Sequence, residues 1–271
     1  MQTPKNQKNA SDELVRLMEL VAHLRGKDGC PWDRKQTPES AASYILEEAY
    51  EAVDAIESGD QQEIMGELGD VLFQVLFQAQ MFAEKEAFSL TETIKTIREK
   101  MIRRHPHVFG KDQVENSDQV RELWGKIKDR ERSRNGQGLL DSVPKGAPAL
   151  KRASRLGQRA ARVGFDWSTQ QDVWEKVNEE IAELKEARTP EETTAELGDL
   201  LFSLAQWARH QDIDPEAALR GANQKFQNRF TGMESLAQKR GLDLSNMDIR
   251  EMDRLWEEVK LTSPKGDNKE Y

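Results

Sequence analysis

Two pairs of acidic motifs contain the residues of this sequence that are best suited to chemistry. Each pair has a Glu-Glu-x-x-Glu motif followed by a Glu-x-x-Asp motif, and acids three residues apart lie on one face of a helix. In the first pair we call four of them the N-terminal carboxylates: Glu48, Glu51, Glu67 and Asp70. Their counterparts in the second pair are the C-terminal carboxylates: Glu180, Glu183, Glu196 and Asp199.

The spacing of each set around a predicted turn brings its four acids to matched heights. Glu51 and Glu67 both lie eight residues from Gly59, and the other two N-terminal carboxylates lie eleven residues from it. With a rise of about 1.5 Å per residue, two antiparallel helices would hold these groups together roughly 12–16 Å from the turn. The C-terminal carboxylates lie six and seven, then nine and ten, residues from Thr189. Both sets are therefore predicted to converge.

Four carboxylates that converge between packed helices need a compensating positive charge. On an exposed helix such pairs repel by only about 0.2–0.5 kcal/mol, but at about 4 Å and an effective dielectric constant near 20 each pair costs roughly 4 kcal/mol. Ligation by carboxylate oxygens suits Mg²⁺, Mn²⁺ or Ca²⁺. A di-iron bundle would need Glu-x-x-His motifs, which these motifs lack. The alternative is a solvated acidic face, but the same arrangement occurs twice.

Basic residues at repeated positions are candidates for binding phosphate. Lys225 and Arg229 lie one helical turn apart, as do Lys100 and Arg104. Arginine holds phosphate oxygens with a bidentate fork and lysine holds them as a point charge. Lys176 precedes Glu180 by four residues and so shares its helix face. Each of these residues can also be read as ordinary surface charge.

Two tryptophans also occupy matched positions near the ends of the two halves. Trp124 and Trp256 are suited to stacking on a nucleotide base. A hydrophobic cap at the end of each half explains them equally well, so both interpretations stay open.

Helix signals place the first pair of motifs on two consecutive helices. Thr37-Pro38-Glu39 predicts an N-cap followed by proline at the first helical position, in a helix that runs to about Glu57. Asp60 with Glu63 resembles a capping box and begins the next helix. The apolar run at 71–77 predicts that this second helix is largely buried.

The second pair of motifs follows the same plan. Ser168 with Gln171 predicts a capping box for a helix that runs to about Arg188. Thr189-Pro190 opens the next helix, whose apolar run at 200–204 also predicts burial.

The two halves match beyond these helices, which indicates a duplicated module. We predict an all-α fold with two tandem helical modules, at 11–128 and 150–261, each containing an antiparallel helical hairpin that carries the acidic motifs. Glycine and proline mark 129–149 as a linker. Three further stretches match in the same order: Trp32 with Trp167, Lys100–Arg104 with Lys225–Arg229, and Leu123–Lys128 with Leu255–Lys260.

Composition limits the partners of this chain. Its net charge of −9 and pI of about 5.2 give no overall attraction for nucleic-acid polymers or anionic membranes. One cysteine, Cys30, fits a reducing compartment. The polar start of the chain lacks an apolar signal segment, and no apolar run reaches the roughly 20 residues that span a bilayer. We therefore expect a cytoplasmic protein.

With these motifs in place, the sequence resembles the MazG family of nucleoside triphosphate pyrophosphohydrolases over nearly its whole length. The resemblance implies an all-α fold, Mg²⁺ dependence, homodimerisation and hydrolysis of NTPs and dNTPs to the monophosphate and pyrophosphate. It also implies a role in clearing aberrant or excess nucleotides. Beside the acidic motifs it rests on four stretches: Gly29–Asp33 (GCPWD), Arg104–Phe109 (RHPHVF), Val163–Trp167 (VGFDW) and Lys225–Phe230 (KFQNRF).

The resemblance also implies roles for individual residues. Both sets of carboxylates would be metal ligands. For the mechanism, our own hypothesis is that one glutamate, Glu179 or Glu47, accepts a proton from the attacking water. We place Glu180 with these two as a catalytic candidate. The segment 193–195 has no basic residue where the family would offer a lysine, so one phosphate contact is in doubt. The nucleotide would contact Lys176, Glu179, Lys225, Arg229 and Trp256, with Lys100 and Arg104 as the first-module candidates.

Two questions stay open at this point. Both modules keep the acidic motifs, so the sequence does not decide which of them is catalytic, although the apolar helix around Lys225 and Arg229 favours the second. The alternative from another class is a non-catalytic helical protein that binds Mg²⁺ or a nucleotide without turnover.

Overall fold

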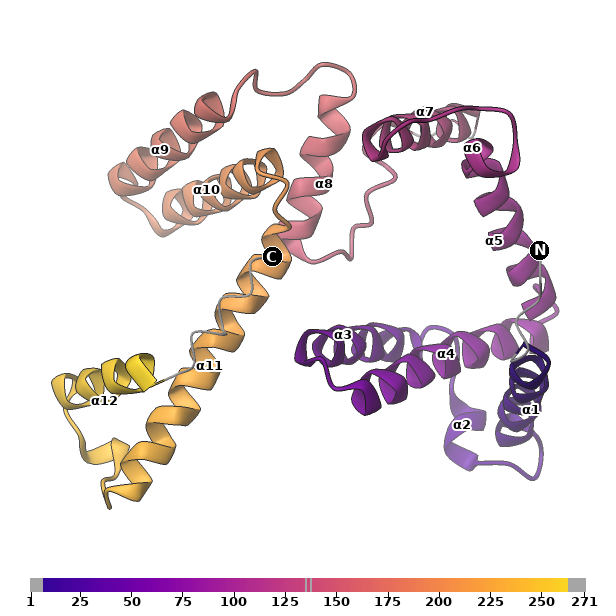
Figure 1. Cartoon of the computed structure of the whole chain (residues 1–271), viewed down its shortest axis with the longest axis horizontal. Coiled ribbons are helices and arrows are strands. Elements are labelled where there is room, and N and C mark those ends of the chain that lie inside the picture. The colour runs from indigo at the N-terminus through magenta and orange to yellow at the C-terminus, as the bar shows by residue number, and fades with distance from the viewer. Residues whose placement is uncertain (1–6, 135, 137, 263–271) are drawn as a thin grey trace. The chain divides into compact units, whose positions relative to one another are not determined.

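The computed structural model describes residues 7–134, 136 and 138–262, and in this part of the chain every regular element is a helix. The all-α prediction is confirmed. The chain divides into two compact units, Met1–Ile127 and Lys128–Tyr271 (Figure 1). The first unit contains α1 (Gln7–Arg25), α2 (Pro31–Lys35), α3 (Ala42–Ser58), α4 (Gln61–Glu84), α5 (Leu90–Arg104) and α6 (Pro106–Phe109). Helix α7 (Ser117–Arg134) crosses the division, and the second unit continues with α8 (Ala149–Ala161), α9 (Gln170–Glu186), α10 (Pro190–His210), α11 (Pro215–Lys239), the 3₁₀ helix η1 (Leu244–Asn246) and α12 (Ile249–Thr262).

Each unit contains a helical hairpin, formed by α3 with α4 and by α9 with α10 (Figure 1). Gly59 ends α3 in the left-handed conformation at φ 80°, which glycine adopts without steric cost. Asp60 then caps α4 by accepting hydrogen bonds from the backbone of Gln62 and Glu63. In the second unit Thr189 caps α10 in a full capping box with Glu192. These short connections hold each helix pair side by side.

Two predicted helix starts were wrong. Helix α3 begins at Ala42, after Thr37, because the Thr37 hydroxyl accepts a hydrogen bond from the backbone of Ser40 and so stabilises a separate turn. Helix α9 is capped by Thr169 in a capping box with Asp172, one residue later than predicted from Ser168 and Gln171. At α9 the neighbouring Thr169 takes the capping role, whereas α3 begins without a side-chain cap.

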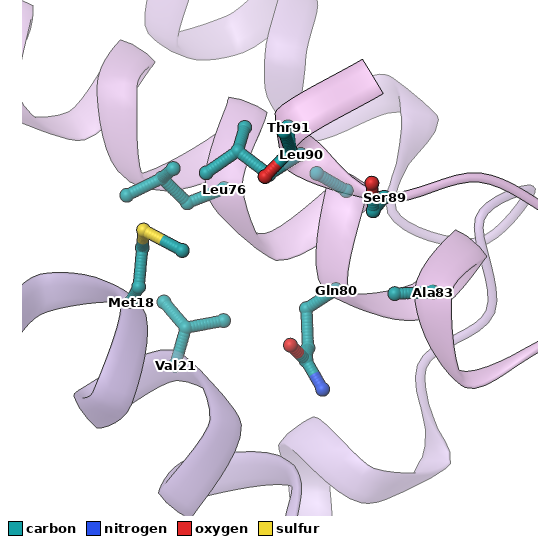
Figure 2. Close-up of a pocket in the computed structure, with 9 residues that line it drawn as sticks. Met18, Val21, Leu76, Gln80, Ala83, Ser89, Leu90 and Thr91 are labelled. Carbon is teal, nitrogen blue, oxygen red and sulfur yellow. The ribbon is translucent and has the colours of Figure 1, made fainter. Parts of the chain in front are cut away.

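The core of the first unit lies where α1 packs on α4. The guanidinium carbon of Arg25 lies 5.2 Å from the centroid of the Phe77 ring, and its Nη2 atom lies 2.7 Å from the Glu84 carboxylate. A cavity of about 200 Å³ lies beside this core, between α1, α4 and the start of α5 (Figure 2). None of its nine lining residues is charged, so it is distinct from the acidic motifs. The buried core residues are Val21, Ala41, Leu76, Phe77 and Met81.

In the second unit α8 packs against α10 through a buried polar contact. The fully buried Gln206 donates from Nε2 to the carbonyl of Ala153, 2.8 Å away, and accepts from Nε of Arg209. Gly157 makes room for this amide, because a β-carbon there would overlap Oε1 of Gln206. This contact fixes α8 on the helix that carries Glu196.

The loop before α9 is tied to the end of α10 by an ion pair. Asp166 accepts from Arg209 and lies 3.0 Å from Nε2 of His210. Burial favours the neutral form of Asp166, but the hydrogen bonds from Arg209 and His210 outweigh it and lower the pKa of this carboxyl to about 2. The second hairpin is therefore anchored at the end opposite its turn.

The predicted burial of the apolar run 71–77 holds on one side only, and in the run 200–204 only Ser203 is buried. Leu76 and Phe77 are buried, but Leu72 and Val75 remain 43% and 41% exposed. One face of α4 thus carries a stripe of apolar side chains exposed to solvent, comprising Met65, Leu68, Leu72 and Val75. The same positions are uncovered on α10, where the stripe comprises Leu197, Leu201 and Leu204.

Candidate active site

The first hairpin brings three of the four N-terminal carboxylates together. One carboxylate oxygen from each of Glu48, Glu67 and Asp70 lies within 4.8 Å of the others. Glu48 comes from α3 and the other two from α4, so the matched heights around Gly59 produce the predicted convergence. Glu51 is exposed and lies outside this group, yet its charge acts on Glu67.

Glu67 shows that this group is short of positive charge. Its Oε2 atom is buried without a hydrogen-bond partner in the described part of the chain. Burial raises the pKa of Glu67, and the charges of Glu51, Asp70 and Glu48 raise this pKa further. An orphaned carboxylate oxygen among other acids fits a hard divalent cation, which takes oxygen ligands.

We expect Glu67→Gln to raise the melting temperature of the metal-free protein at pH 8. The raised pKa means that the charged carboxyl opposes folding, and this penalty grows as the pH rises above the ordinary value of 4.5. The gain should vanish near pH 4, where the carboxyl is protonated in either state. Scanning fluorimetry at both pH values measures it, with Glu99→Gln as the exposed control on α5. A lower melting temperature for Glu67→Gln at pH 8 would contradict the assignment.

The second hairpin assembles a similar group from the C-terminal carboxylates. Oxygens of Glu180, Glu183 and Glu196 lie within 4.8 Å of one another, whereas Asp199 is exposed and lies outside the group. Glu180 is the most buried, with 5% of its side chain exposed. Burial raises the pKa of Glu183, and the charges of Glu180 and Glu196 add to the rise.

Lys176 already neutralises part of this second group. Its Nζ lies 2.8 Å from Oε1 of Glu179 and 2.8 Å from Oε1 of Glu180. These hydrogen bonds, first to Glu179 and then to Glu180, raise the pKa of Lys176 and keep it charged. The i, i+4 placement seen in the sequence therefore produces a direct ion pair. Glu179 itself remains accessible, with 56% of its side chain exposed.

The other basic candidates of the second unit lie on α11 beside α12. The guanidinium of Arg229 lies 6.0 Å from the centroid of the Trp256 ring, and Lys225 lies one turn earlier on α11. Phe226, which the sequence did not single out as a site residue, lies 5.4 Å from Trp256 and is 61% exposed. The signal available in the sequence was an aromatic residue directly after Lys225.

The matched positions of the first unit are arranged differently. Lys100 and Arg104 lie on α5, and both are half-buried. Trp124 stands edge-on to His105 at 4.9 Å between ring centroids. The ring beside this tryptophan is thus an imidazole, whereas the ring beside Trp256 is that of Phe226. Glu47, the counterpart of Glu179, is exposed on α3.

The regions that carry the carboxylates match known protein families. Residues 36–109 match the MazG nucleotide pyrophosphohydrolase domain, and residues 157–226 match phosphoribosyl-ATP pyrophosphohydrolase. A nucleoside triphosphate pyrophosphohydrolase/pyrophosphatase MazG from Thermotoga maritima is 44% identical over 249 residues, which cover 92% of this chain and 95% of that protein. The nucleoside triphosphate pyrophosphohydrolase of Escherichia coli K12 is 43% identical over 256 residues, covering 92% of this chain and 97% of the relative.

This chain belongs to the MazG family. Both relatives are matched along nearly their full length, so the similarity covers both units and both acidic groups. Among solved structures, the crystal structure of a mazG-related protein from Thermotoga maritima matches 42% of this chain and 97% of its own, at 24% identity and a TM-score of 0.37.

Proposed function

We propose that this MazG protein hydrolyses nucleoside and deoxynucleoside triphosphates to the monophosphate and pyrophosphate, and so removes unwanted nucleotides from the cellular pool. Two relatives that match nearly the whole chain are named as nucleoside triphosphate pyrophosphohydrolases. The observation that supports it most directly is the pair of acidic groups, each with carboxylate oxygens within 4.8 Å of one another. Such groups suit the binding of a triphosphate through divalent metal.

The cofactor that we propose is Mg²⁺, with Mn²⁺ able to replace it. Glu180, Glu183 and Glu196 would hold it in the second unit, and Asp199, three residues after Glu196 on α10, would complete the set. The ion, when bound, would neutralise triphosphate oxygens and lower the barrier to attack by water. The N-terminal carboxylates would form the equivalent site, for which the orphaned Glu67 oxygen is the supporting observation.

The chain's own residues supply the remaining chemistry. We assign Glu179 as the general base in the second unit, because its carboxylate is exposed one residue before a buried candidate ligand, and Glu47 as its counterpart. Lys176, Lys225 and Arg229 would bind phosphate oxygens and stabilise the departing pyrophosphate. Trp256 would hold the base, and Phe226 enlarges the same aromatic surface.

The second unit is the one that we propose as catalytic. It combines a lysine on the acidic group with an arginine beside an aromatic surface. In the first unit Tyr44 stands where Lys176 stands in the second, and Trp124 contacts His105. Lys100 and Arg104 would still bind phosphate there, in a site that holds nucleotide or metal.

Hydrolysis in ¹⁸O-labelled water tests the proposed reaction. Attack of water on the α-phosphorus places the label in the monophosphate and leaves the pyrophosphate unlabelled, because the bond that breaks joins the α-phosphorus to the bridging oxygen. Mass spectrometry of the two products distinguishes this from attack at the β- or γ-phosphorus. Label in the pyrophosphate, or in inorganic phosphate, would rule out the proposed cleavage.

We further propose that the protein is a homodimer. The uncovered apolar stripes on α4 and α10 recur at equivalent positions of the two units, and large uncovered stripes on helical hairpins are typical of association surfaces. A second copy of the same chain supplies matching stripes, which suits a two-fold symmetric helical bundle. The expected mass is twice 31.0 kDa.

Placing a charge in the stripes should dissociate this dimer. Leu72→Asp combined with Leu201→Asp puts a carboxylate on each stripe. Burying these carboxylates against a partner costs several kcal/mol, which lowers the affinity of dimerisation roughly a thousandfold. Light scattering after size exclusion should then give one copy, 31.0 kDa. Leu261→Asp, at a leucine that is 85% exposed outside the stripes, is the control and should leave the dimer intact. A monomeric parent protein would contradict the proposal.

Nucleoside triphosphates and Mg²⁺ meet in the cytoplasm, and we place the protein there. Its one thiol, Cys30, is compatible with that compartment. No helix in the described ranges is long and apolar enough to cross a bilayer. We propose no nucleic-acid polymer and no membrane as a partner, because the net charge is −9.

A further inference from the structure

The two acidic groups differ in the residue one helical turn before their first glutamate, Glu48 on α3 and Glu180 on α9. In the second unit Nζ of Lys176 lies 2.8 Å from Oε1 of Glu180, four residues along α9. In the first unit the position four residues before Glu48 is Tyr44, which packs against the core instead. Glu48 instead accepts a hydrogen bond from a neutral amide, Nε2 of Gln74, at 3.3 Å.

The ion pairs of the two groups show the same difference. Lys176 pairs with both Glu179 and Glu180 in the second unit. Among the described residues no ion pair involves the acids of the N-terminal group, and Oε2 of Glu67 is buried there without a hydrogen-bond partner. Within the described part of the chain, the C-terminal group therefore contains its own cation and the N-terminal group does not.

We propose that Lys176 takes the place of the metal ion in the nucleotide-free C-terminal site, so that this site takes up its divalent cation together with the nucleotide, whereas the N-terminal site binds the cation alone. This inference rests on the proposed function. An incoming cation must displace an ammonium that already holds Glu179 and Glu180, which weakens its binding. The phosphates of a nucleotide offer that ammonium a new anionic partner. Metal and nucleotide then favour each other's binding by the same factor.

Manganese binding without turnover tests this inference. In the Glu67→Gln variant, which leaves the C-terminal site, free Mn²⁺ measured by electron paramagnetic resonance gives the affinity of that site. Lys176→Gln in this background should tighten Mn²⁺ binding about tenfold, because an opposing charge next to the ion is removed. Lys185→Gln removes an exposed lysine of the same helix that does not pair with Glu179 or Glu180, and should change the affinity less than about twofold.

The coupling to nucleotide gives a second readout. An α,β-methylene triphosphate, which resists cleavage at the proposed bond, should raise the Mn²⁺ affinity strongly when Lys176 is present and much less in Lys176→Gln. The converse variant adds a cation to the other unit: in the Glu196→Gln background, Tyr44→Lys should weaken Mn²⁺ binding at the N-terminal site about tenfold.

The outcomes separate this inference from the function on which it rests. If, with the α,β-methylene triphosphate present, Glu196→Gln added to Glu67→Gln leaves Mn²⁺ binding unchanged, the proposed C-terminal metal site itself is wrong. If Glu196→Gln removes binding but Lys176→Gln leaves the affinity the same or weaker, the site stands and the role of Lys176 is overturned. Tightening by Lys176→Gln with loss of the coupling supports it.

Discussion

Glu196→Gln is expected to lower the rate of triphosphate hydrolysis by about a thousandfold. Glu196 joins α10 to the Glu180 and Glu183 carboxylates of α9, with oxygens within 4.8 Å of one another. Replacing one charged oxygen with an amide nitrogen removes a proposed metal ligand and so shifts the metal charge that stabilises the transition state. Loss of a single such contact lowers the rate by about 10²–10³. Steady-state release of pyrophosphate measures the effect.

The controls for this variant use the same chemical change elsewhere. Glu191→Gln lies on the exposed first turn of α10 and should keep full activity. Glu67→Gln, at the equivalent position of the first unit, should keep most of the activity if the second unit is catalytic. Full activity in Glu196→Gln, in Asp199→Asn and in the double variant would refute the assignment of the active unit.

Gly157→Ala is expected to destabilise the second unit by about 3 kcal/mol. The added methyl group would overlap the amide of Gln206, which is fully buried, and would force it away from the carbonyl of Ala153 and from Arg209. Overpacking costs about 1–3 kcal/mol and a broken buried hydrogen bond costs about as much again. The melting temperature of this unit should fall by roughly 6–12 °C.

A second helical glycine provides the matched control. Gly221 lies on α11, and a β-carbon there meets no atom within 4 Å. Gly221→Ala should therefore be neutral or stabilising by up to about 1 kcal/mol, since alanine favours the helix. Calorimetry of both variants compares them directly. Equal melting temperatures for Gly157→Ala and the parent protein would show that α8 does not depend on this close contact.

The hairpins and their acidic groups were predictable because local signals determine them. Acids three residues apart share a helix face, and Gly59 ends α3 in the conformation that glycine favours. Counting residues from that turn placed Glu48 opposite Asp70, and the two lie in one group. Glu51 and Asp199 lie outside the groups, because helix register sets a height but not the direction of each side chain.

Other features depended on contacts that a single sequence does not encode. The burial predicted for 71–77 was half right, and the burial predicted for 200–204 was wrong for Leu201, Phe202 and Leu204. The partner that we propose for the uncovered stripes is another copy of the chain. The start of α3 was wrong because Thr37 closes a turn with Ser40 before the helix begins. The contact of Phe226 with Trp256 joins α11 to α12 across a loop.

Product analysis with each nucleoside triphosphate and Mg²⁺ tests the central claim most directly. The purified protein would be incubated with each substrate, and the products separated by anion exchange, with and without EDTA. We predict monophosphate and pyrophosphate in equal amounts, and no reaction once EDTA removes the metal. Diphosphate with inorganic phosphate, or turnover that persists in EDTA, would contradict the account.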